Sequence, residues 1–442
     1  MSSESGITAA QGWTSGLTRQ HWRILLASFL GWVFDGYETY ALIVVMPFAL
    51  KSLLLPEQYA SMPLWAGIAV GITLLGWGVG GMTGGVFADY VGRKRMMMIS
   101  VFLYALFSGL TAFSTSFTVL VALRFLTGLA LGSEWSTGVT LLAETWPDRA
   151  RPKGGGFLQS GFGWGTLLSA LVWMILGAWQ PLGDATWRLM FAFGALPAFF
   201  LLYIRRSIDE SERWLNAVKE KRWITEGSAD DERRPFTLAQ IFRDPSSRKL
   251  ILLTFLLSLS AMVGWWAIAT WEPALAVSLA KAQGLAKPAV WGARVGLTYT
   301  VGATTAYIVA GFLADGVGRR WYLFITYAGA IISAPLTYLW PSTVQQLMVV
   351  AFISGFFTLG LAYSWMAIYP VELFTSLVRS TAASFIFNAS RLIAWVFPII
   401  AGSLIAYFGS IPKAAMIFSS IYVLGLIVPW FLPETRGKPL PE

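Results

Sequence analysis

The sequence predicts an all-α polytopic membrane protein whose twelve transmembrane helices form two pseudo-symmetric six-helix bundles. The chain of 442 residues is 56% hydrophobic and only 12% charged, with a mean hydropathy of +0.62, whereas soluble proteins carry about 25% charged residues. Many apolar runs reach the roughly 20 residues that a helix needs to cross a bilayer. They lack the alternating segments of about ten residues that are typical of a β-barrel.

A short polar segment between two apolar runs is repeated in the second half of the chain. The first copy reads Gly85-Val-Phe-Ala-Asp89-Tyr-Val-Gly92-Arg93-Lys94-Arg95, and the second reads Gly311-Phe-Leu-Ala-Asp315-Gly-Val-Gly318-Arg319-Arg320. Another repeated pair, Glu144 with Arg151 and Glu372 with Arg379, lies shortly after the fourth and tenth apolar runs. Two similar halves in parallel orientation are typical of secondary transporters, which hold a substrate near the membrane midplane between the halves.

The apolar runs divide the chain into three parts. Residues 1–204 are expected to form an N-terminal bundle, 205–248 a charged cytoplasmic linker with one or two amphipathic helices, and 249–442 a C-terminal bundle. The expected spans are 23–50, 63–88, 95–115, 117–143, 155–178 and 187–204 in the first bundle, and 249–277, 290–315, 321–340, 343–368, 380–407 and 413–432 in the second.

The basic residues predict the orientation in the membrane. With the N-terminus in the cytoplasm, cytoplasmic segments hold 24 of the 32 Lys and Arg residues and outer loops hold six. This asymmetry follows the positive-inside rule and predicts that both termini lie in the cytoplasm. We expect the membrane to be a bacterial inner membrane. The asymmetry also accounts for the net charge of +9 without any nucleic-acid partner. No nucleotide-binding motif or His/Cys metal cluster is present, so we expect neither an enzyme nor a cofactor.

These motifs resemble those of the major facilitator superfamily over essentially the whole chain. The relevant segments are Gly85-x-x-x-Asp89-x-x-Gly92-Arg93-Lys94, Arg124-Phe-Leu-Thr-Gly128, Glu210-Ser-Glu-Arg213-Trp-Leu and Pro433-Glu434-Thr-Arg436-Gly437. The segment Asp35-Gly36-Tyr37-Glu38 resembles aromatic-acid/proton symporters, whereas Gly132-Ser-Glu134-Trp135 is similar to metabolite, sialate or lactate symporters. The resemblance implies a monomeric, proton-driven symporter that imports a small organic anion, most often a carboxylate, by alternating access.

An exporter or anion exchanger of the same fold is the alternative. Proton-coupled drug exporters resemble one another in a Gly-Pro motif on the fifth span. Here that span reads Gly161-Phe-Gly-Trp-Gly165-Thr, without proline. The missing motif favours import over export.

Three acidic residues within the spans are candidates for proton coupling. Placing an ionised side chain at the membrane centre costs roughly 2.5–3.5 kcal/mol, so such residues are functional candidates. Asp35 and Glu38 are three residues apart and share one helix face, where their repulsion disfavours joint ionisation. The alternative is an ion pair with the fourth span that only fixes packing. Glu134 is either a further proton site or the partner of a nearby cation.

The substrate contacts are predicted from the basic, amide and aromatic residues within the spans. Arg391 suits a bidentate clamp on a substrate carboxylate, with a structural ion pair as the alternative. Arg124 is a second anion contact or the counter-ion of a carboxylate. Further candidates, each with plain helix packing as its alternative, are Asn388, Gln159, Trp265, Trp266 and Tyr363. In the resembled family the helices of the last three residues line the cavity, where aromatic rings suit a planar or sugar-like substrate.

Charges that occur in both halves are predicted to form a cytoplasmic gate. Asp89 is expected to pair with Arg93 or Arg95, or to meet a helix N-terminus of the other half. Glu144 is expected to pair with Arg149 or Arg151. The predicted gate comprises Asp89, Gly92, Arg93, Glu144, Arg151, Asp315, Arg319, Glu372 and Arg379, with Glu372 paired to Arg379. One exposed ion pair contributes only about 0–1 kcal/mol, so a gate needs several pairs.

Overall fold

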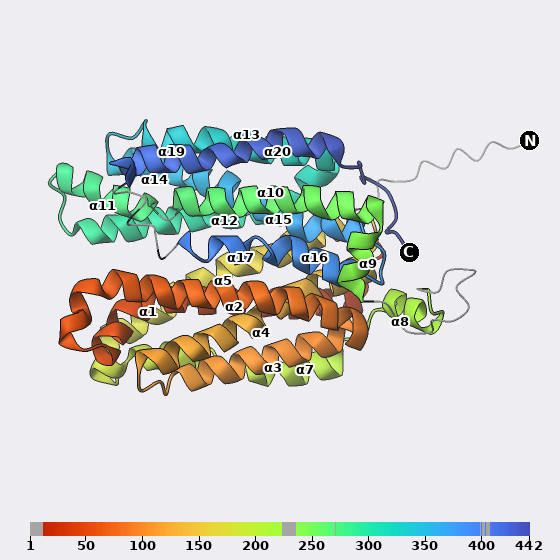
Figure 1. Ribbon diagram of the computed structural model, residues 1–442, viewed down its shortest axis with the longest axis horizontal. Helices are drawn as coiled ribbons and strands as arrows, with labels where there is room; N and C mark the ends of the chain where they lie inside the picture. Colours follow the sequence, from red (N-terminus) through yellow and green to blue (C-terminus); the bar gives the residue numbers. More distant parts are fainter. Residues whose placement is uncertain (1–11, 223–235, 270, 398, 400–402, 404–406) are drawn as a thin grey trace, which may run out of the picture.

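Long helices run side by side in two groups in the computed structural model (Figure 1). The structure describes residues 12–222, 236–269, 271–397, 399, 403 and 407–442. The helices α1 to α7 form one group and α10 to α20 the other. The helices α8 and α9 and the C-terminus lie at one end of the molecule, which we call the terminal end; α11 lies at the opposite, far end.

The first group contains seven helices. They are α1 (Arg19–Leu53), α2 (Met62–Val91), α3 (Arg93–Thr111), α4 (Phe117–Thr145), α5 (Arg151–Trp179), α6 (Trp187–Phe193) and α7 (Pro197–Ser207). Two short helices follow, α8 (Glu212–Lys219) and α9 (Thr237–Arg243). The short α6 and α7 together occupy the sixth expected span.

The second group is more interrupted than the first. It contains α10 (Pro245–Ala269), α11 (Glu272–Ala282), α12 (Pro288–Val317), α13 (Arg319–Tyr338), α14 (Val344–Ser354), α15 (Ala362–Ile368), α16 (Arg379–Asn388), α17 (Arg391–Ala394), α19 (Ile411–Ser419) and α20 (Leu424–Ile427). A π-helical segment, Gly355–Leu361, joins α14 to α15. The seventh span is divided where Pro273 occupies the first turn of α11, the position in which a helix tolerates proline.

Eight helical segments in the described part of the chain are long and apolar enough to cross a membrane. They are Arg19–Leu53, Pro56–Val91, Phe117–Thr145, Arg151–Trp179, Pro245–Trp265, Val290–Val317, Val344–Glu372 and Ile411–Phe431. The four remaining expected spans coincide with α3, with α6 and α7, with α13, and with α16 and α17. These segments are shorter, broken or charged at one end.

Two tight glycine turns begin α3 and α13, the helices that follow the repeated motif. Gly92 has φ 99° and Gly318 has φ 87°, a backbone region that side chains other than glycine rarely enter. Each helix start is capped by a distant glutamate: the N–H of Arg93 donates to Glu210 Oε1 at 3.0 Å, and that of Arg319 donates to Glu434 Oε1 at 2.9 Å. A carboxylate is favoured at a helix N-terminus.

The Glu434 carboxylate lies outside the membrane-spanning helices and accepts several hydrogen bonds from backbone N–H groups. Burial acts to raise its pKa, but hydrogen bonds from the backbone N–H groups of Arg319, Arg436 and Arg320 outweigh burial and lower the pKa below its usual range. The cap is therefore ionised at neutral pH, and its stabilising contribution is lost only as the pH falls through this lowered pKa.

Candidate functional site

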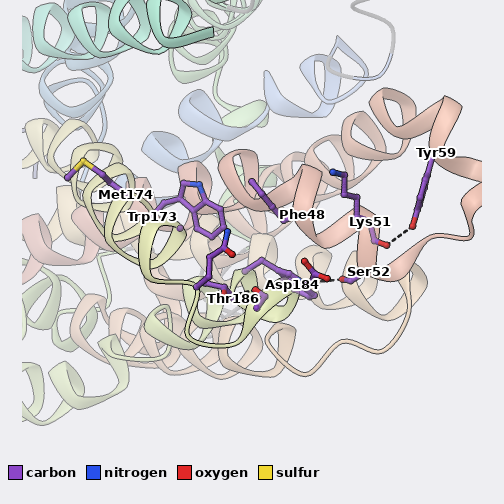
Figure 2. Close-up of a pocket in the computed structure, with 12 residues that line it drawn as sticks. Phe48, Lys51, Ser52, Tyr59, Trp173, Met174, Asp184 and Thr186 are labelled. Atoms are coloured by element: carbon purple, nitrogen blue, oxygen red, sulfur yellow. Dashed lines mark hydrogen bonds between the residues drawn. The ribbon is translucent and has the colours of Figure 1, made fainter. Parts of the chain in front are cut away.

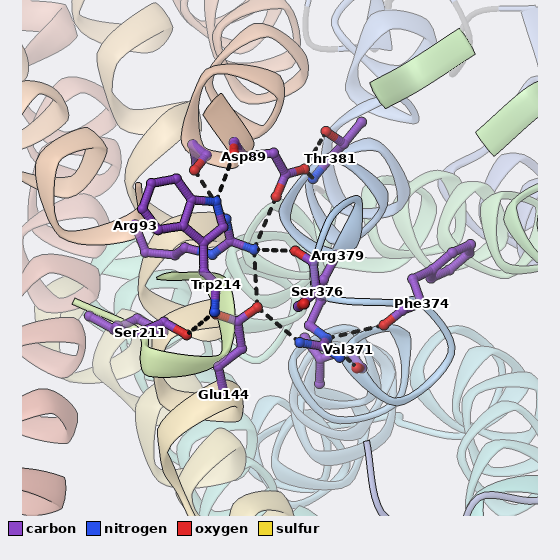
Figure 3. A network of polar contacts seen from close by, with 12 residues as sticks. Asp89, Arg93, Glu144, Ser211, Trp214, Val371, Phe374, Ser376, Arg379 and Thr381 are labelled. Atoms are coloured by element: carbon purple, nitrogen blue, oxygen red, sulfur yellow. Dashed lines mark hydrogen bonds and ion pairs between the residues drawn. The ribbon is translucent and has the colours of Figure 1, made fainter. Parts of the chain in front are cut away.

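A buried network of charges joins the two halves at the terminal end (Figure 3). Arg93 Nη2 lies 3.1 Å from Asp89 Oδ1 and 3.0 Å from Glu144 Oε1. The same Glu144 oxygen lies 2.9 Å from Arg379 Nη1 in the second half. Asp89 also accepts hydrogen bonds from the backbone N–H and the hydroxyl of Thr381 at 2.8 and 2.6 Å. Asp89 therefore makes both kinds of contact that its motif predicts.

The second copy of the motif forms a related network. Glu372 lies 2.7 Å from Arg319 Nη2 within its own half and 3.7 Å from Arg151 Nη1 in the other half. Asp315 pairs with Arg319 at 2.9 Å and also with Lys153 across the interface. The sequence analysis did not single out Lys153, whose basic character alone suggests only the positive-inside rule.

The pairing of the two gate glutamates corrects the sequence prediction. Glu144 was expected to pair with Arg149 or Arg151, and Glu372 with Arg379. Instead Glu144 contacts Arg379 and Glu372 contacts Arg151, so the partners are exchanged between the halves. The loops after the fourth and tenth spans face each other across the interface, and each glutamate reaches the arginine of the opposite loop. Because of this exchange, the ion pairs of Glu144 and Glu372 join the halves, while Arg151 also pairs with Asp148 of its own loop.

Two buried carboxylates in the first half have no hydrogen-bond partner among the described residues. Asp35 on α1 and Glu134 on α4 are 0% and 1% exposed, and none of their four carboxylate oxygens is bonded within that part of the chain. The Glu134 carboxylate lies against Gly31, one helical turn before Asp35. The two groups are close enough to interact electrostatically.

Glu38, unlike Asp35, has an ion-pair partner. Its Oε2 lies 2.8 Å from Arg124 Nη1, and its Oε1 accepts a hydrogen bond from Ser108 at 2.5 Å. Arg124 Nη2 donates further hydrogen bonds to Thr111 and Thr127. Glu38 and Arg124 thus satisfy each other inside the first half, and this contact corresponds to the counter-ion alternative for Arg124 rather than to a substrate contact.

Arg391 on α17 is a buried cation without an acidic partner in the described chain. It is 5% exposed, and its guanidinium lies over the rings of Trp77 and Phe387 at 4.7 and 4.1 Å from their centroids. Its Nη1 donates to the Phe387 carbonyl and, at 3.3 Å, to Asn388 Oδ1. Asn388 itself donates to the Ser384 carbonyl at 3.0 Å, so it orients the arginine from within the same half.

Arg391 lines a narrow cavity between the two halves. The walls are mostly aromatic and apolar, and both halves contribute to them. They comprise Trp32, Thr39, Leu74, Trp77, Gln159, Phe162, Met262, Trp265, Tyr307, Leu359, Tyr363, Phe387 and Arg391. The predicted contacts Gln159, Trp265 and Tyr363 are therefore brought together with Arg391, whereas the Trp266 side chain lies outside the described part of the structure.

The polar groups of this cavity are few. Gln159 Oε1 accepts a hydrogen bond from Trp135 at 2.8 Å, and its Nε2 is unbonded among the described residues. Tyr363 donates to the Met262 sulfur at 3.2 Å and packs edge-to-face against Trp265. The cavity thus offers one cation, the Gln159 amide, the hydroxyl groups of Thr39, Tyr307 and Tyr363, and a set of aromatic faces.

A larger depression lies at the far end of the first half (Figure 2). It is open to the outside and lined by Phe48, Lys51, Ser52, Tyr59, Trp173, Met174, Gly177, Gln180, Gly183, Asp184, Thr186 and Trp187. It contains none of the predicted site residues and only one half of the protein contributes to it. The cavity at Arg391 is the better candidate for transport because its walls come from both halves.

Sequence reasoning missed the aromatic residues that surround the arginine. Trp77 lies in the glycine-rich second span, and Phe387 stacks on Trp135 of the other half with ring centroids 3.6 Å apart. The sequence could have indicated Phe387, because it lies four residues before Arg391 and residues four apart share a helix face. Among the described residues, no group of three or more acidic or histidine side chains is placed to hold a metal ion.

Comparison with known proteins defines the class to which this fold and site belong. A family model described as sugar (and other) transporter matches residues 24–442. The structure is similar to that of the proton:xylose symporter XylE, a major facilitator superfamily protein, with a TM-score of 0.77 at 21% identity, covering 95% of this chain and 98% of XylE. The predicted fold class is confirmed, and the protein is a multi-pass membrane transporter rather than an enzyme. The chain belongs to the sugar (and other) transporter family of the major facilitator superfamily.

Three bacterial relatives match nearly the whole chain. A putative metabolite transport protein of Haemophilus influenzae is 29% identical, covering 97% of this chain and 100% of the relative. A probable 4-methylmuconolactone transporter of Cupriavidus pinatubonensis is 27% identical, covering 96% and 93%. A cis,cis-muconate transport protein of Acinetobacter baylyi is 27% identical, covering 95% and 96%. The protein is accordingly a secondary transporter of metabolites.

The exchanged ion pairs generate a first prediction about the terminal end. Ser380 is buried close to Gly85 of the other half, and the chain has no cysteine, so Ser380→Cys introduces a unique reporter thiol. We expect Glu144→Gln to raise the rate of labelling of this thiol by tenfold or more. Removing one member of a buried pair costs about 3–5 kcal/mol, and each 1.4 kcal/mol is about tenfold in an equilibrium.

The control for this experiment is Glu220→Gln. Glu220 pairs with Arg222 at 2.8 Å, but its side chain is 56% exposed. Exposed pairs contribute about 0–1 kcal/mol, so labelling is expected to stay near the rate of the parent. Equal labelling of the Glu144→Gln protein and its parent would show that these ion pairs do not hold the terminal end closed.

Proposed function

We propose that the protein is a proton-driven symporter that imports a small, planar organic carboxylate by alternating access. The observation that carries this proposal is Arg391: a buried guanidinium without an acidic partner in the described chain, in a cavity between the halves. A buried cation is costly unless it is paired, and a substrate carboxylate supplies the missing partner. The guanidinium fork suits bidentate contact with a carboxylate.

The aromatic walls support the choice of a planar substrate. Trp77 and Phe387 already bracket the guanidinium, and Trp265 and Tyr363 face the same cavity. Aromatic faces favour flat, conjugated ligands through stacking, and Arg391 supplies the cation that a carboxylate needs. Two relatives are described as transporters of cis,cis-muconate and of 4-methylmuconolactone, which agrees with a small unsaturated acid.

Proton coupling follows from the electrostatic link between Arg391 and Asp35. The two side chains belong to different halves and interact electrostatically. The positive charge of Arg391 opposes protonation of Asp35. A bound carboxylate cancels that charge, so Asp35 binds a proton more readily when the substrate is present. Binding of either ligand therefore strengthens binding of the other, as linkage requires.

Glu134 extends the proton site, while Glu38 supports it. Because the Glu134 carboxylate lies against Gly31, one turn before Asp35 on α1, and has no bonded partner in the described chain, a single proton can be shared between these two carboxylates. In this proposal Glu38, which Arg124 already neutralises, fixes the packing of α1 against α4. The proton-coupling role is thereby narrowed from three carboxylates to Asp35 and Glu134.

The buried gate supplies the alternating access. With the ion pairs of Glu144 and Glu372 intact, the terminal end is closed, and rocking of one half against the other breaks the pairs that cross the interface. In this proposal residues 1–204 and 249–442 are the two moving bundles, 205–248 is the cytoplasmic linker, and the terminal end faces the cytoplasm of a bacterial inner membrane. The protein acts as a monomer, since one chain contains the complete cavity.

A second prediction tests the proton site. In proteoliposomes with an imposed inward proton gradient, we expect wild-type protein to accumulate the acid that gives the largest thermal shift in a screen of aromatic, conjugated, sugar and short-chain acids. Asp35→Asn should abolish accumulation but retain exchange of labelled for unlabelled acid, because an amide cannot release a proton. Asp184→Asn, at an exposed outer position, is the control and should behave as wild type.

The outcomes of the uptake experiment separate the alternatives. Accumulation that is indifferent to the proton gradient but driven by unlabelled acid on the opposite side would indicate an exchanger. Proton-driven accumulation that survives Asp35→Asn would exclude Asp35 as the coupling group.

A third prediction tests the carboxylate clamp. We expect Arg391→Lys to weaken binding of an acid such as benzoate by about 10–100-fold, because charge-assisted hydrogen bonds contribute about 1.5–3 kcal/mol. Binding of the uncharged amide of the same acid should change little. Isothermal calorimetry on the purified protein measures both. Arg294→Lys is the matched control, since Arg294 also lies over a tryptophan ring but is exposed at the far end. Equal losses for acid and amide would eliminate the clamp.

A further inference from the structure

A buried carboxylate in the second half has no role in the mechanism described so far. Glu272 is the first residue of α11, directly after the interruption of the seventh span, and it is 1% exposed. The repeated segments of the two halves lie 226–228 residues apart, and no acidic residue of the first half lies that far before Glu272. Glu272 therefore does not belong to the gate residues that both halves share. Its position lies away from the Arg391 cavity, whose lining does not include it.

Only one of the two carboxylate oxygens of Glu272 has a hydrogen-bond partner among the described residues. Its Oε1 accepts a hydrogen bond from Ser354 at 2.5 Å, and its Oε2 has no partner among the described residues. Glu272 forms none of the ion pairs found in that part of the chain. No side-chain nitrogen of a described Lys, Arg or His therefore lies within 4.0 Å of its carboxylate. Glu38 provides a direct contrast: it has the same serine contact at 2.5 Å but is also paired with Arg124.

The basic residues of the adjacent helices, Lys281 on α11 and Arg294 on α12, form no ion pair with Glu272 in the described part of the chain. The titratable groups that face it are Tyr299 on α12 and Tyr338 on α13. Both phenols are already engaged, with Thr358 at 2.8 Å and with the Ile268 carbonyl. The neighbouring part of α11, α12 and α14 is an apolar cluster that includes Ala276, Val295 and Ala351. An ionised carboxylate buried without a cation is costly, whereas a protonated one is compatible with this site.

The Glu272–Ser354 contact joins two places where regular helix geometry is interrupted. Glu272 follows the break between α10 and α11, and Ser354 is the last residue of α14, immediately before the π-helical segment Gly355–Leu361. Such π-helical segments are rare and are frequently found at functional sites. The Glu272–Ser354 contact joins the start of α11 to the end of α14, and Gln283, which follows α11, accepts a hydrogen bond from the N–H of Val344 at the start of α14 at 2.8 Å.

We propose that Glu272 is a second proton-binding site, and that its neutral carboxyl group fastens α11 to α14 through Ser354. Loss of the proton places an unpaired charge in the apolar cluster and releases α11 at the far end. The link between this site and transport rests on the proposed proton-driven function. The occupancy of the site by a proton does not, and it is measured separately.

Infrared difference spectroscopy between acidic and alkaline pH tests the proposal on purified full-length protein. A protonated carboxyl group has a carbonyl band that shifts in heavy water and is absent from an ionised one. We expect the wild-type difference spectrum to contain one such band that Glu272→Gln lacks. The control Glu57→Gln removes an exposed carboxylate from the same end of the molecule and should keep that band.

A second variant makes the test independent of how well Glu272→Gln folds. Ser354→Ala removes the hydroxyl that donates to Glu272, so the band should remain but move to higher wavenumber. A Glu272→Gln spectrum identical to that of wild type, or a Ser354→Ala band that does not move, would overturn the proposal. Because neither spectrum depends on added substrate, either result leaves the roles of Asp35 and Arg391 to be decided by transport.

Discussion

The cost of burying a charge is the constraint on which the organisation of this protein depends. An unpaired ion in a low-dielectric interior is unfavourable by several kcal/mol, and the protein meets this constraint at most of its buried charges. Asp89 and Glu144 neutralise Arg93 and Arg379 at the terminal end, and Glu38 neutralises Arg124 within the first half. Asp35, Glu134 and Arg391 are exceptions, since they have no ion-pair partner among the described residues. In the proposed mechanism a proton neutralises the carboxylates and an anionic substrate pairs with Arg391.

The paired and unpaired charges have complementary tasks in alternating access. The pairs of Glu144 with Arg379 and of Glu372 with Arg151 cross the interface at the terminal end, so in the proposed mechanism they stabilise one conformation and separate in the other. The unpaired ones flank the cavity and lie in opposite halves, Asp35 on α1 and Arg391 on α17. In the proposed mechanism a proton and a carboxylate together add no net charge, but each gives an unpaired buried charge its missing partner. Movement of the halves over paired groups costs less than movement over an unpaired Arg391, and this difference is the proposed basis of coupling.

Sequence reasoning recovered the architecture and the identity of most charged positions, but not their partners. The repeat of the Asp89 and Asp315 segments was visible because both copies keep the same residue types at the same spacing, and the embedded charges stood out against apolar runs. The pairing of Glu144 with Arg379 was not predictable, because it depends on how two helices separated by more than 200 residues face each other. Trp77 and Phe387 were hidden for another reason. The chain contains 22 Trp, 30 Phe and 15 Tyr residues, so aromatic character alone does not distinguish a cavity wall from a lipid-facing surface.

The central claim is that a carboxylate at Arg391 and a proton at Asp35 bind together, and direct measurement of proton uptake tests it. The purified protein is placed in a weakly buffered solution with a pH indicator, and the carboxylate or its uncharged amide is added across a range of pH. We predict saturable alkalinisation with the acid, little with the amide, and loss of the acid response in Asp35→Asn. Saturable binding of the acid without proton uptake at any pH would contradict the proposed coupling.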